Sequence, residues 1–97
     1  MTDEELDRVF KALGDPTRRR IIDRLRERPR QSLFEICALS FARDGAVLSR
    51  QAITQHLDML EKAGLVTVEW VGRTKFHSLA SGPLREAVDA WLGKHLT

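Results

Sequence analysis

The 97-residue sequence contains a single cysteine, Cys37, and no long apolar run. One cysteine cannot form a disulfide within the chain, and it excludes the multi-cysteine frameworks that hold structural zinc. No apolar stretch approaches the ~20 residues that a transmembrane helix requires. The N-terminus is acidic, whereas a secretory signal has a basic start followed by an apolar stretch. We therefore expect a cytoplasmic protein without a membrane partner.

The sequence also lacks internal repeats, low-complexity segments, linkers and catalytic motifs. It contains no suggestive pair of carboxylates, no nucleophile with its base and no glycine-rich phosphate loop. We therefore expect no enzymatic activity and no cofactor. With 97 residues, of which 42% are hydrophobic and 31% charged, the chain has the size and composition of one globular domain covering residues 1–97.

Positive charge is unevenly distributed, although the net charge is only +2. Seven arginines lie between Arg18 and Arg30, whereas four acidic residues fall within the first seven positions. A basic segment suits a protein that contacts a polyanion on one side. The arginines from Arg18 to Arg20 begin an expected helix, where the positive helix dipole disfavours them. We expect at least one of them to pair with an acid such as Asp23 or Glu27.

Capping residues and helical periodicity predict four helices in the first two thirds of the chain. Polar residues that can cap a helix N-terminus precede four stretches of apolar residues at helical spacing: Thr2, Asp15, Ser32 and Ser49. Glycine or proline residues follow three of these stretches and predict where the helices end. Residues 41–45 are expected to form a turn, which is long for a tight helix-turn-helix.

The periodicity changes after Gly64. Alternating apolar residues over 66–79, with a turn at Gly72-Arg73, predict a hairpin of two strands. Gly82-Pro83 ends the hairpin, and apolar spacing predicts a last helix at about 83–96. The expected fold is mostly α-helical with a small β-hairpin. This order of elements is typical of a winged helix-turn-helix domain, in which the hairpin is the wing.

The fourth predicted helix, at about 50–63, has the properties of a helix that reads DNA. Ile53, Leu57 and Leu60 cluster on one side at 100° per residue, and Gln51, Gln55, Asp58 and Lys62 lie opposite. The uncharged glutamines and the flanking Thr54 are notable, because a merely solvated helix more often carries Glu and Lys. Glutamine can read adenine, arginine can bind guanine and threonine can contact a thymine methyl. The candidate DNA-binding residues of this helix are Arg50, Gln51, Thr54, Gln55 and His56.

Two further candidates for DNA contact are the hairpin tip and the second helix. A basic tip can serve solubility alone, but beside a reading helix it suggests a phosphate or minor-groove contact. His56 lies nearer the apolar side of its helix, so we expect it to pack at the domain edge or bind a phosphate. The additional candidate residues are Arg73, Thr74, Lys75 and Arg18.

The first and last predicted helices carry more apolar residues than a chain of this size readily buries. Both could pack into one core, but we favour a homodimer formed by these two helices. Two-fold symmetry would then place two reading helices about one DNA turn, ~34 Å, or a multiple of it apart on a palindromic operator. The candidate interface residues are Leu6, Val9, Phe10, Leu13, Leu84, Val88, Trp91 and Leu92.

Residues 9–22, VFKALGDPTRRRII, resemble the opening of ArsR-type (ArsR/SmtB) transcriptional regulators. Residues 51–57, QAITQHL, and 62–66, KAGLV, are similar to the recognition helix of that family and the segment that follows it. The resemblance covers nearly the whole chain. It implies a winged-helix homodimer joined through its first and last helices, usually a repressor that a signal releases from its operator.

The sequence departs from that family where its members bind metals. Metal-sensing members often carry Cys-x-Cys after a glutamate in the third helix, whereas here Leu39 takes the place of the second cysteine. In others Asp-x-His on the last helix binds metal, but here Trp91 replaces that histidine and His95 stands nearly alone. We therefore expect no metal site. Cys37 is either a buried small hydrophobic residue or a redox switch.

These observations predict a DNA-binding transcriptional regulator, a repressor in most members of the family that it resembles. The alternative is a winged-helix module that binds another protein instead of DNA. The sequence identifies neither the operator nor an effector.

Overall fold

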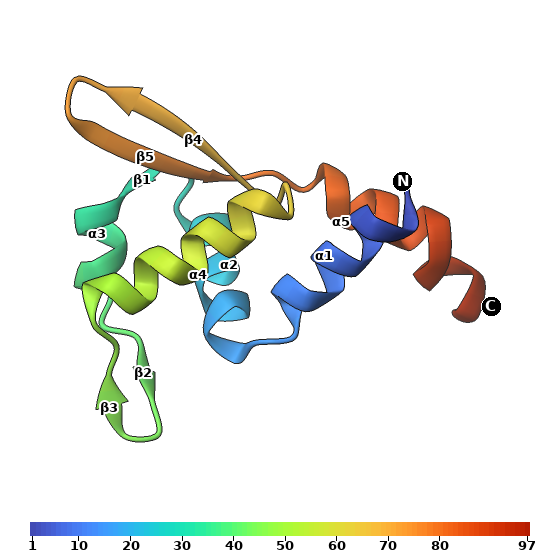
Figure 1. Cartoon of the computed structure of the whole chain (residues 1–97), viewed down its shortest axis with the longest axis horizontal. Helices are drawn as coiled ribbons and strands as arrows, with labels where there is room; N and C mark the ends of the chain where they lie inside the picture. The colour runs from blue at the N-terminus through green and yellow to red at the C-terminus, as the bar shows by residue number, and fades with distance from the viewer.

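The computed structural model describes residues 1–97, in which a body of helices carries a three-stranded sheet on one side and a second, smaller hairpin on the other (Figure 1). No helix has the length and apolar character needed to cross a membrane. The elements in chain order are α1 (Asp3–Leu13), α2 (Pro16–Glu27), β1 (Gln31–Ser32), α3 (Leu33–Ala38), β2 (Ala42–Arg43), β3 (Ala46–Val47), α4 (Arg50–Lys62), β4 (Val66–Val71), β5 (Thr74–Leu79) and α5 (Gly82–Ala87), followed by a π-helical segment (Val88–Leu92) and a 3-10 turn (Gly93–His95).

All four predicted helix starts are confirmed, because each expected cap makes its hydrogen bond. The Thr2 hydroxyl accepts from the Glu5 backbone N–H at 3.1 Å and the Ser32 hydroxyl from that of Glu35 at 3.1 Å. Both glutamate side chains accept in return from the cap backbone, which completes two capping boxes. Asp15 and Ser49 cap α2 and α4 in the same way.

The predicted hairpin is confirmed and forms the wing. Its strands β4 and β5 pair antiparallel from Val66 opposite Leu79 to Val71 opposite Thr74, joined by the turn Gly72-Arg73. The sheet has a third strand, however, because β1 pairs with β5 and gives the order β1-β5-β4. A two-residue strand is too short to show alternation, so the sequence could not predict it.

The expected turn at 41–45 is instead a second hairpin. β2 and β3 pair antiparallel and project from the body on the side opposite the wing (Figure 1). Asp44 and Gly45 connect them with φ values of 54° and 81°. Positive φ at both central residues is what a type I′ turn requires, and Asp-Gly is its characteristic sequence. The predicted turn is therefore present at Asp44-Gly45, but the flanking residues pair as strands, which the sequence interpretation missed.

The last helix is less regular than predicted. Only α5 is α-helical, and the chain then widens into the π-helical segment, where the N–H of Gly93 donates to the carbonyl of Val88. A Cβ atom at Gly93 would lie 2.7 Å from that oxygen, closer than real side chains approach. Gly93 therefore permits the close turn that ends the chain.

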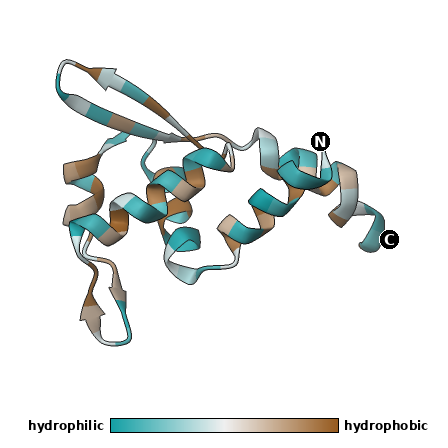
Figure 2. Ribbon diagram, in the orientation of Figure 1, coloured by the Kyte–Doolittle hydropathy of each residue, from teal (hydrophilic) through white to brown (hydrophobic).

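The core lies around α4, which packs against α1, α2, α3 and β4. Figure 2 shows that α4 and α1 alternate hydrophilic and hydrophobic residues along their lengths, as amphipathic helices do. Each large aliphatic side chain buried here stabilises the fold by about 1.5–3 kcal/mol. The buried cluster comprises Ala12, Ile21, Leu25, Ile36, Phe41, Ile53, Leu57, Leu60, Leu65 and Val66.

Candidate nucleic-acid interface

The outer face of α4 presents polar side chains to solvent. Arg50, Gln51 and Gln55 are exposed, while the opposite face of the helix is buried in the core. Thr54 is half-buried, and its hydroxyl donates to the Arg50 carbonyl at 2.9 Å. That bond uses the only hydroxyl proton, so Thr54 can offer a ligand its methyl group and an acceptor. The two glutamines keep their amides free.

The wing tip shares a groove with the first residue of this helix and carries its charge at Arg73. Arg73 and Thr74 are exposed at the turn, whereas Lys75 is half-buried. The Lys75 ammonium lies 3.9 Å from a carboxylate oxygen of Glu61 on α4 and 5.8 Å from the centre of the Trp70 ring. Exposed ion pairs of this kind contribute little to stability. The contacts nevertheless direct Lys75 toward α4, so Arg73 is the cation that projects farthest.

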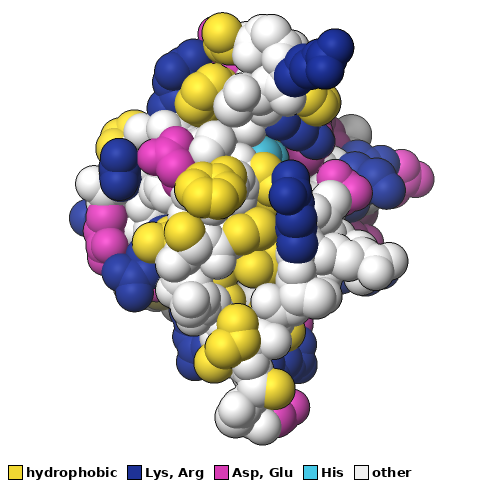
Figure 3. Space-filling model, turned by 90° about the vertical axis from the view of Figure 1, so that its left-hand side faces the viewer, with side chains coloured by type: hydrophobic (Ala, Val, Ile, Leu, Met, Phe, Trp, Pro, Cys, Tyr) yellow, Lys and Arg dark blue, Asp and Glu magenta, His cyan; other side chains and the backbone are white.

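A groove of about 400 Å³ separates the wing from the beginnings of α3 and α4. Figure 3 shows hydrophobic side chains in the middle of this side of the molecule, with arginine and lysine side chains around them. Phe34 is 77% exposed and Trp70 is 64% exposed, and both line the groove with Arg50 and Arg73. Neither aromatic residue was among the predicted DNA-binding residues. Phe34 could have been found, because it lies off the helical stripe formed by Leu33, Ile36 and Cys37.

His56 lies on the other flank of α4, at the edge of the domain. Its Nδ1 is 3.2 Å from a guanidinium nitrogen of Arg18, and the side chain is half-buried. Burial lowers the pKa of His56, and Arg18 and Arg43 lower it further, against the opposing charge of Asp15. The imidazole is therefore neutral near pH 7, and its unprotonated Nδ1 can accept from Arg18.

The three arginines at the start of α2 bind backbone carbonyls, and none pairs with an acid. Arg18 donates to the carbonyls of Ala12 at 2.7 Å and Lys11 at 2.9 Å. Arg19 and Arg20 each donate to a carbonyl as well. The prediction that one of them would pair with Asp23 or Glu27 is wrong, since Arg24 takes Glu27 instead at 3.1 Å.

Helix-end electrostatics explain this arrangement. The last carbonyls of α1 have no partner within their own helix and carry its negative partial charge. Arg18 and Arg19 donate to three of them, at Lys11, Ala12 and Leu13, and the Lys11 carbonyl also accepts from the N–H of Gly14 at 3.3 Å. Arginines that look unfavourable at the start of α2 are thus stabilising at the end of α1. Arg18 uses its donors inside the protein, which makes it a positioning residue for α1 and α4.

Asp15 links α2 to the β2–β3 hairpin. One carboxylate oxygen caps α2, while the other accepts from Arg43 of β2 at 2.8 Å. Burial raises the pKa of Asp15, but the N–H groups of Thr17 and Arg18 and the Arg43 guanidinium lower it more, so the balance is downward. This contact fixes the hairpin that leads directly into α4.

The terminal helices meet along an apolar seam. The rings of Phe10 and Trp91 pack edge-to-face with centroids 5.9 Å apart. Trp91 is still 43% exposed, and Leu96, which is not among the predicted interface residues, is 77% exposed. Val9 is 0% exposed within the single chain, so its placement at a subunit interface was wrong. The remaining interface candidates, Leu6, Phe10, Leu13, Leu84, Val88 and Leu92, are half-buried.

Comparisons with known proteins agree with this architecture. A family model described as "Helix-turn-helix domain" matches residues 13–69. The chain is 40% identical over 86 residues to the HTH-type transcriptional regulator YuzN of Bacillus subtilis, covering 89% of this chain and 94% of that protein. It is 29% identical to the transcriptional repressor SdpR of the same organism, covering 90% of this chain and 88% of that one.

A solved structure extends the likeness to three dimensions. The ArsR-like transcriptional regulator from Rhodococcus sp. RHA1 superimposes with a TM-score of 0.77 at 32% identity, over 96% of this chain and 81% of that one. The chain belongs to the ArsR-type winged helix-turn-helix regulators. It is accordingly a DNA-binding transcriptional regulator.

In this ArsR-type regulator, no three histidine, cysteine, aspartate or glutamate side chains gather into a group that could hold a metal. Cys37 is half-buried and packs against the hydrophobic core. The His95 ring lies 4.4 Å from the Trp91 ring, centre to centre. Cys37 therefore has apolar surroundings, whereas His95 is exposed and contacts the Trp91 ring.

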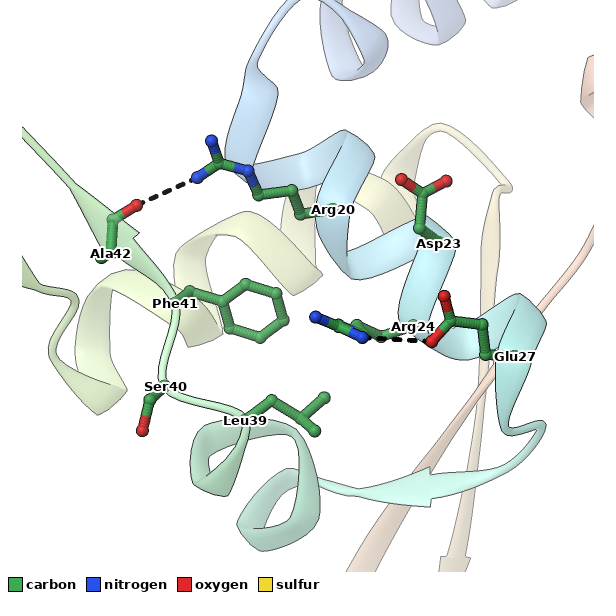
Figure 4. Close-up of a pocket in the computed structure, with 8 residues that line it drawn as sticks. All are labelled: Arg20, Asp23, Arg24, Glu27, Leu39, Ser40, Phe41 and Ala42. Carbon is green, nitrogen blue, oxygen red and sulfur yellow. Dashed lines mark hydrogen bonds and ion pairs between the residues drawn. The ribbon is translucent and has the colours of Figure 1, made fainter.

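A cavity of about 300 Å³ lies between α2 and the segment that joins α3 to β2 (Figure 4). Arg20 donates across it to the Ala42 carbonyl at 3.0 Å, and Arg24 bonds Glu27 at 3.1 Å beside the Phe41 ring. Two arginines and two acids line the cavity, so their charges balance. The Arg20 contact gives the β2–β3 hairpin of this regulator a second attachment to α2.

Proposed function

We propose that Gln51 and Gln55 read base edges in the major groove while Arg73 of the wing binds the DNA backbone. The supporting observation is that both amides are exposed on the outward face of a helix whose other face is buried. Glutamine offers a paired donor and acceptor that matches adenine. Arg50 and Thr54 extend the same surface, and the Thr54 methyl group can contact a thymine methyl.

The wing and α3 complete the proposed interface. Arg73 and Thr74 stand at the tip, where a cation contacts phosphate or the minor groove. Phe34 and Trp70 line the groove between wing and helix, where exposed aromatic surface suits sugar and thymine methyl contacts. Arg18 and His56 bind each other, and we assign both to positioning α4 instead of DNA contact.

We infer that the regulator acts as a homodimer joined through α1 and the segment 82–95. Trp91, which packs against Phe10 of α1, is 43% exposed there, and Met1 and Leu96 at the two chain ends are exposed as well. A two-fold axis at this end would present α4 twice and match a palindromic operator, with reading helices about 34 Å or a multiple of it apart. The relative SdpR is a repressor, and we propose repression here. We treat the chain as a binding protein and not an enzyme, because its family regulates transcription.

The test is a selection of duplexes from a random pool, followed by binding titrations on the selected sequence. Affinity should fall by roughly 10³–10⁵ between about 50 and 200 mM salt if 6–10 phosphates are contacted. Gln55→Ala should relax sequence preference, whereas Arg73→Gln should weaken all sequences alike. Arg26→Gln, which removes an exposed charge of α2, is the matched control. No binding at low salt, or binding indifferent to salt, would favour the protein-interaction alternative.

A further inference from the structure

A second basic surface lies between α1 and α4, away from the wing. A groove of about 470 Å³ is lined there by five residues, Arg8, Lys11, Met59, Lys62 and Ala63. Three of the five are cations and none is acidic, in a chain whose net charge is only +2. We call these three side chains the α1–α4 basic cluster.

The cations of this cluster are almost free of internal partners. Neither Lys11 nor Lys62 takes part in any ion pair of the chain. Arg8 has one, with Glu4 at 3.8 Å, and both side chains of that pair are more than half exposed. Glu5 and Glu86 line an adjoining pocket with Arg8 and Lys62, but neither forms an ion pair with them, and like charges gathered without paired counter-charges repel each other. The cluster therefore suits an anionic ligand.

The shape of α1 separates this cluster from the proposed dimer seam. Val9 and Ala12 face the core, and Phe10 packs toward Trp91. At ~100° per residue, Arg8 and Lys11 occupy the remaining side of the helix, which is turned toward α4. The basic cluster and the apolar seam can thus be used at the same time.

The cluster also continues the reading face of α4. At ~100° per residue, Lys62 points between the directions of Gln51 and Gln55. It lies about 10 Å farther along the helix axis than Gln55, at ~1.5 Å per residue. That distance corresponds to about three base pairs of duplex. A duplex seated on the glutamines would therefore meet the basic cluster within the same site.

We propose that Arg8, Lys11 and Lys62 bind the sugar-phosphate backbone of the operator between its two half-sites. The proposal rests on the proposed function, because it assumes a homodimer joined through α1. The beginning of α4 lies beside α3, and its end lies beside α1 (Figure 1). In such a dimer, the two basic clusters lie closer to the symmetry axis than the beginnings of the two reading helices do. They would therefore contact the phosphates in the centre of the palindrome, which neither the glutamines nor the wing reaches.

The experiment measures the slope of log Kd against log salt on the selected operator for wild type, Lys11→Gln, Lys62→Gln and Lys62→Arg. Each lost phosphate contact lowers the slope by about 0.9, so one substitution in a dimer should lower it by about 1.8. Base preference should not change, and Lys62→Arg should keep the wild-type slope. Arg26→Gln is the control for loss of an exposed charge elsewhere.

Three results overturn the proposal in distinguishable ways. Wild-type slopes in both lysine-to-glutamine variants would refute the backbone contact and leave the proposed function intact. A lower melting temperature with an unchanged slope would show that the lysines only stabilise the helix ends where they lie. Absence of salt-dependent binding by the wild-type protein would refute the proposed function itself.

Discussion

Arg18→Gln separates a structural role from a DNA-binding role for the first of the three arginines. The guanidinium donates to the carbonyls of Ala12 and Lys11 and lies 3.2 Å from His56 Nδ1. A hydrogen bond with a charged partner contributes about 1.5–3 kcal/mol. Because the site is half-buried, water can replace part of the loss, and we expect about 2–3 kcal/mol of destabilisation in total.

Urea unfolding at fixed protein concentration measures this effect, since the stability of a dimer depends on concentration. With an m value of about 1–2 kcal/mol/M for a small chain, the midpoint should fall by about 1–3 M. Arg26→Gln should leave the midpoint unchanged. The reasoning would be refuted if Arg18→Gln unfolded like wild type while the salt dependence of DNA binding fell, because Arg18 would then be a phosphate ligand.

Three further perturbations have defined outcomes. Burial lowers the pKa of His77, and the hydrogen bond to the Gln31 carbonyl opposes this shift only in part. The unfolded chain therefore binds a proton at His77 more readily than the folded one, and the stability should fall as the pH drops below about 6.5. Melting temperatures recorded from about pH 7.5 to 5.5 should show this fall, and a fall of equal steepness in His77→Gln would contradict the assignment. Trp91→Ala should shift sedimentation toward monomer at micromolar concentration, and an unchanged dimer would place the interface elsewhere. Cys37→Ser should bind operator DNA like wild type before and after mild peroxide treatment, because the thiol packs against the core; oxidation that weakened wild type alone would show a redox switch.

Local chemistry was the part of the fold that the sequence could predict. Thr2, Asp15, Ser32 and Ser49 each bond to backbone within three residues, so their caps depend on nothing distant. The wing followed from its alternation and a two-residue turn. The third strand depends on pairing between Gln31 and His77, which are 46 residues apart, and no local pattern encodes it.

The sequence could predict which side chains of the recognition helix face outward, but not the hydrogen bonds that hold the surrounding side chains in place. The direction of Gln51 and Gln55 followed from helical geometry alone. The partners of Arg18 could not be inferred, because they are backbone carbonyls of another helix. Every residue has a backbone carbonyl, so the residue types do not indicate which ones accept a hydrogen bond. For the same reason Val9 looked like an interface residue until the packing of α1 was known.

The most direct test is a hydroxyl-radical footprint of the selected operator, combined with the stoichiometry of the complex. Two chains should bind one duplex and protect two symmetric windows on one face, about 34 Å or a multiple of it apart. Gln55→Ala should weaken both windows together. One chain on a single asymmetric window would contradict the claim that a homodimer presents α4 twice.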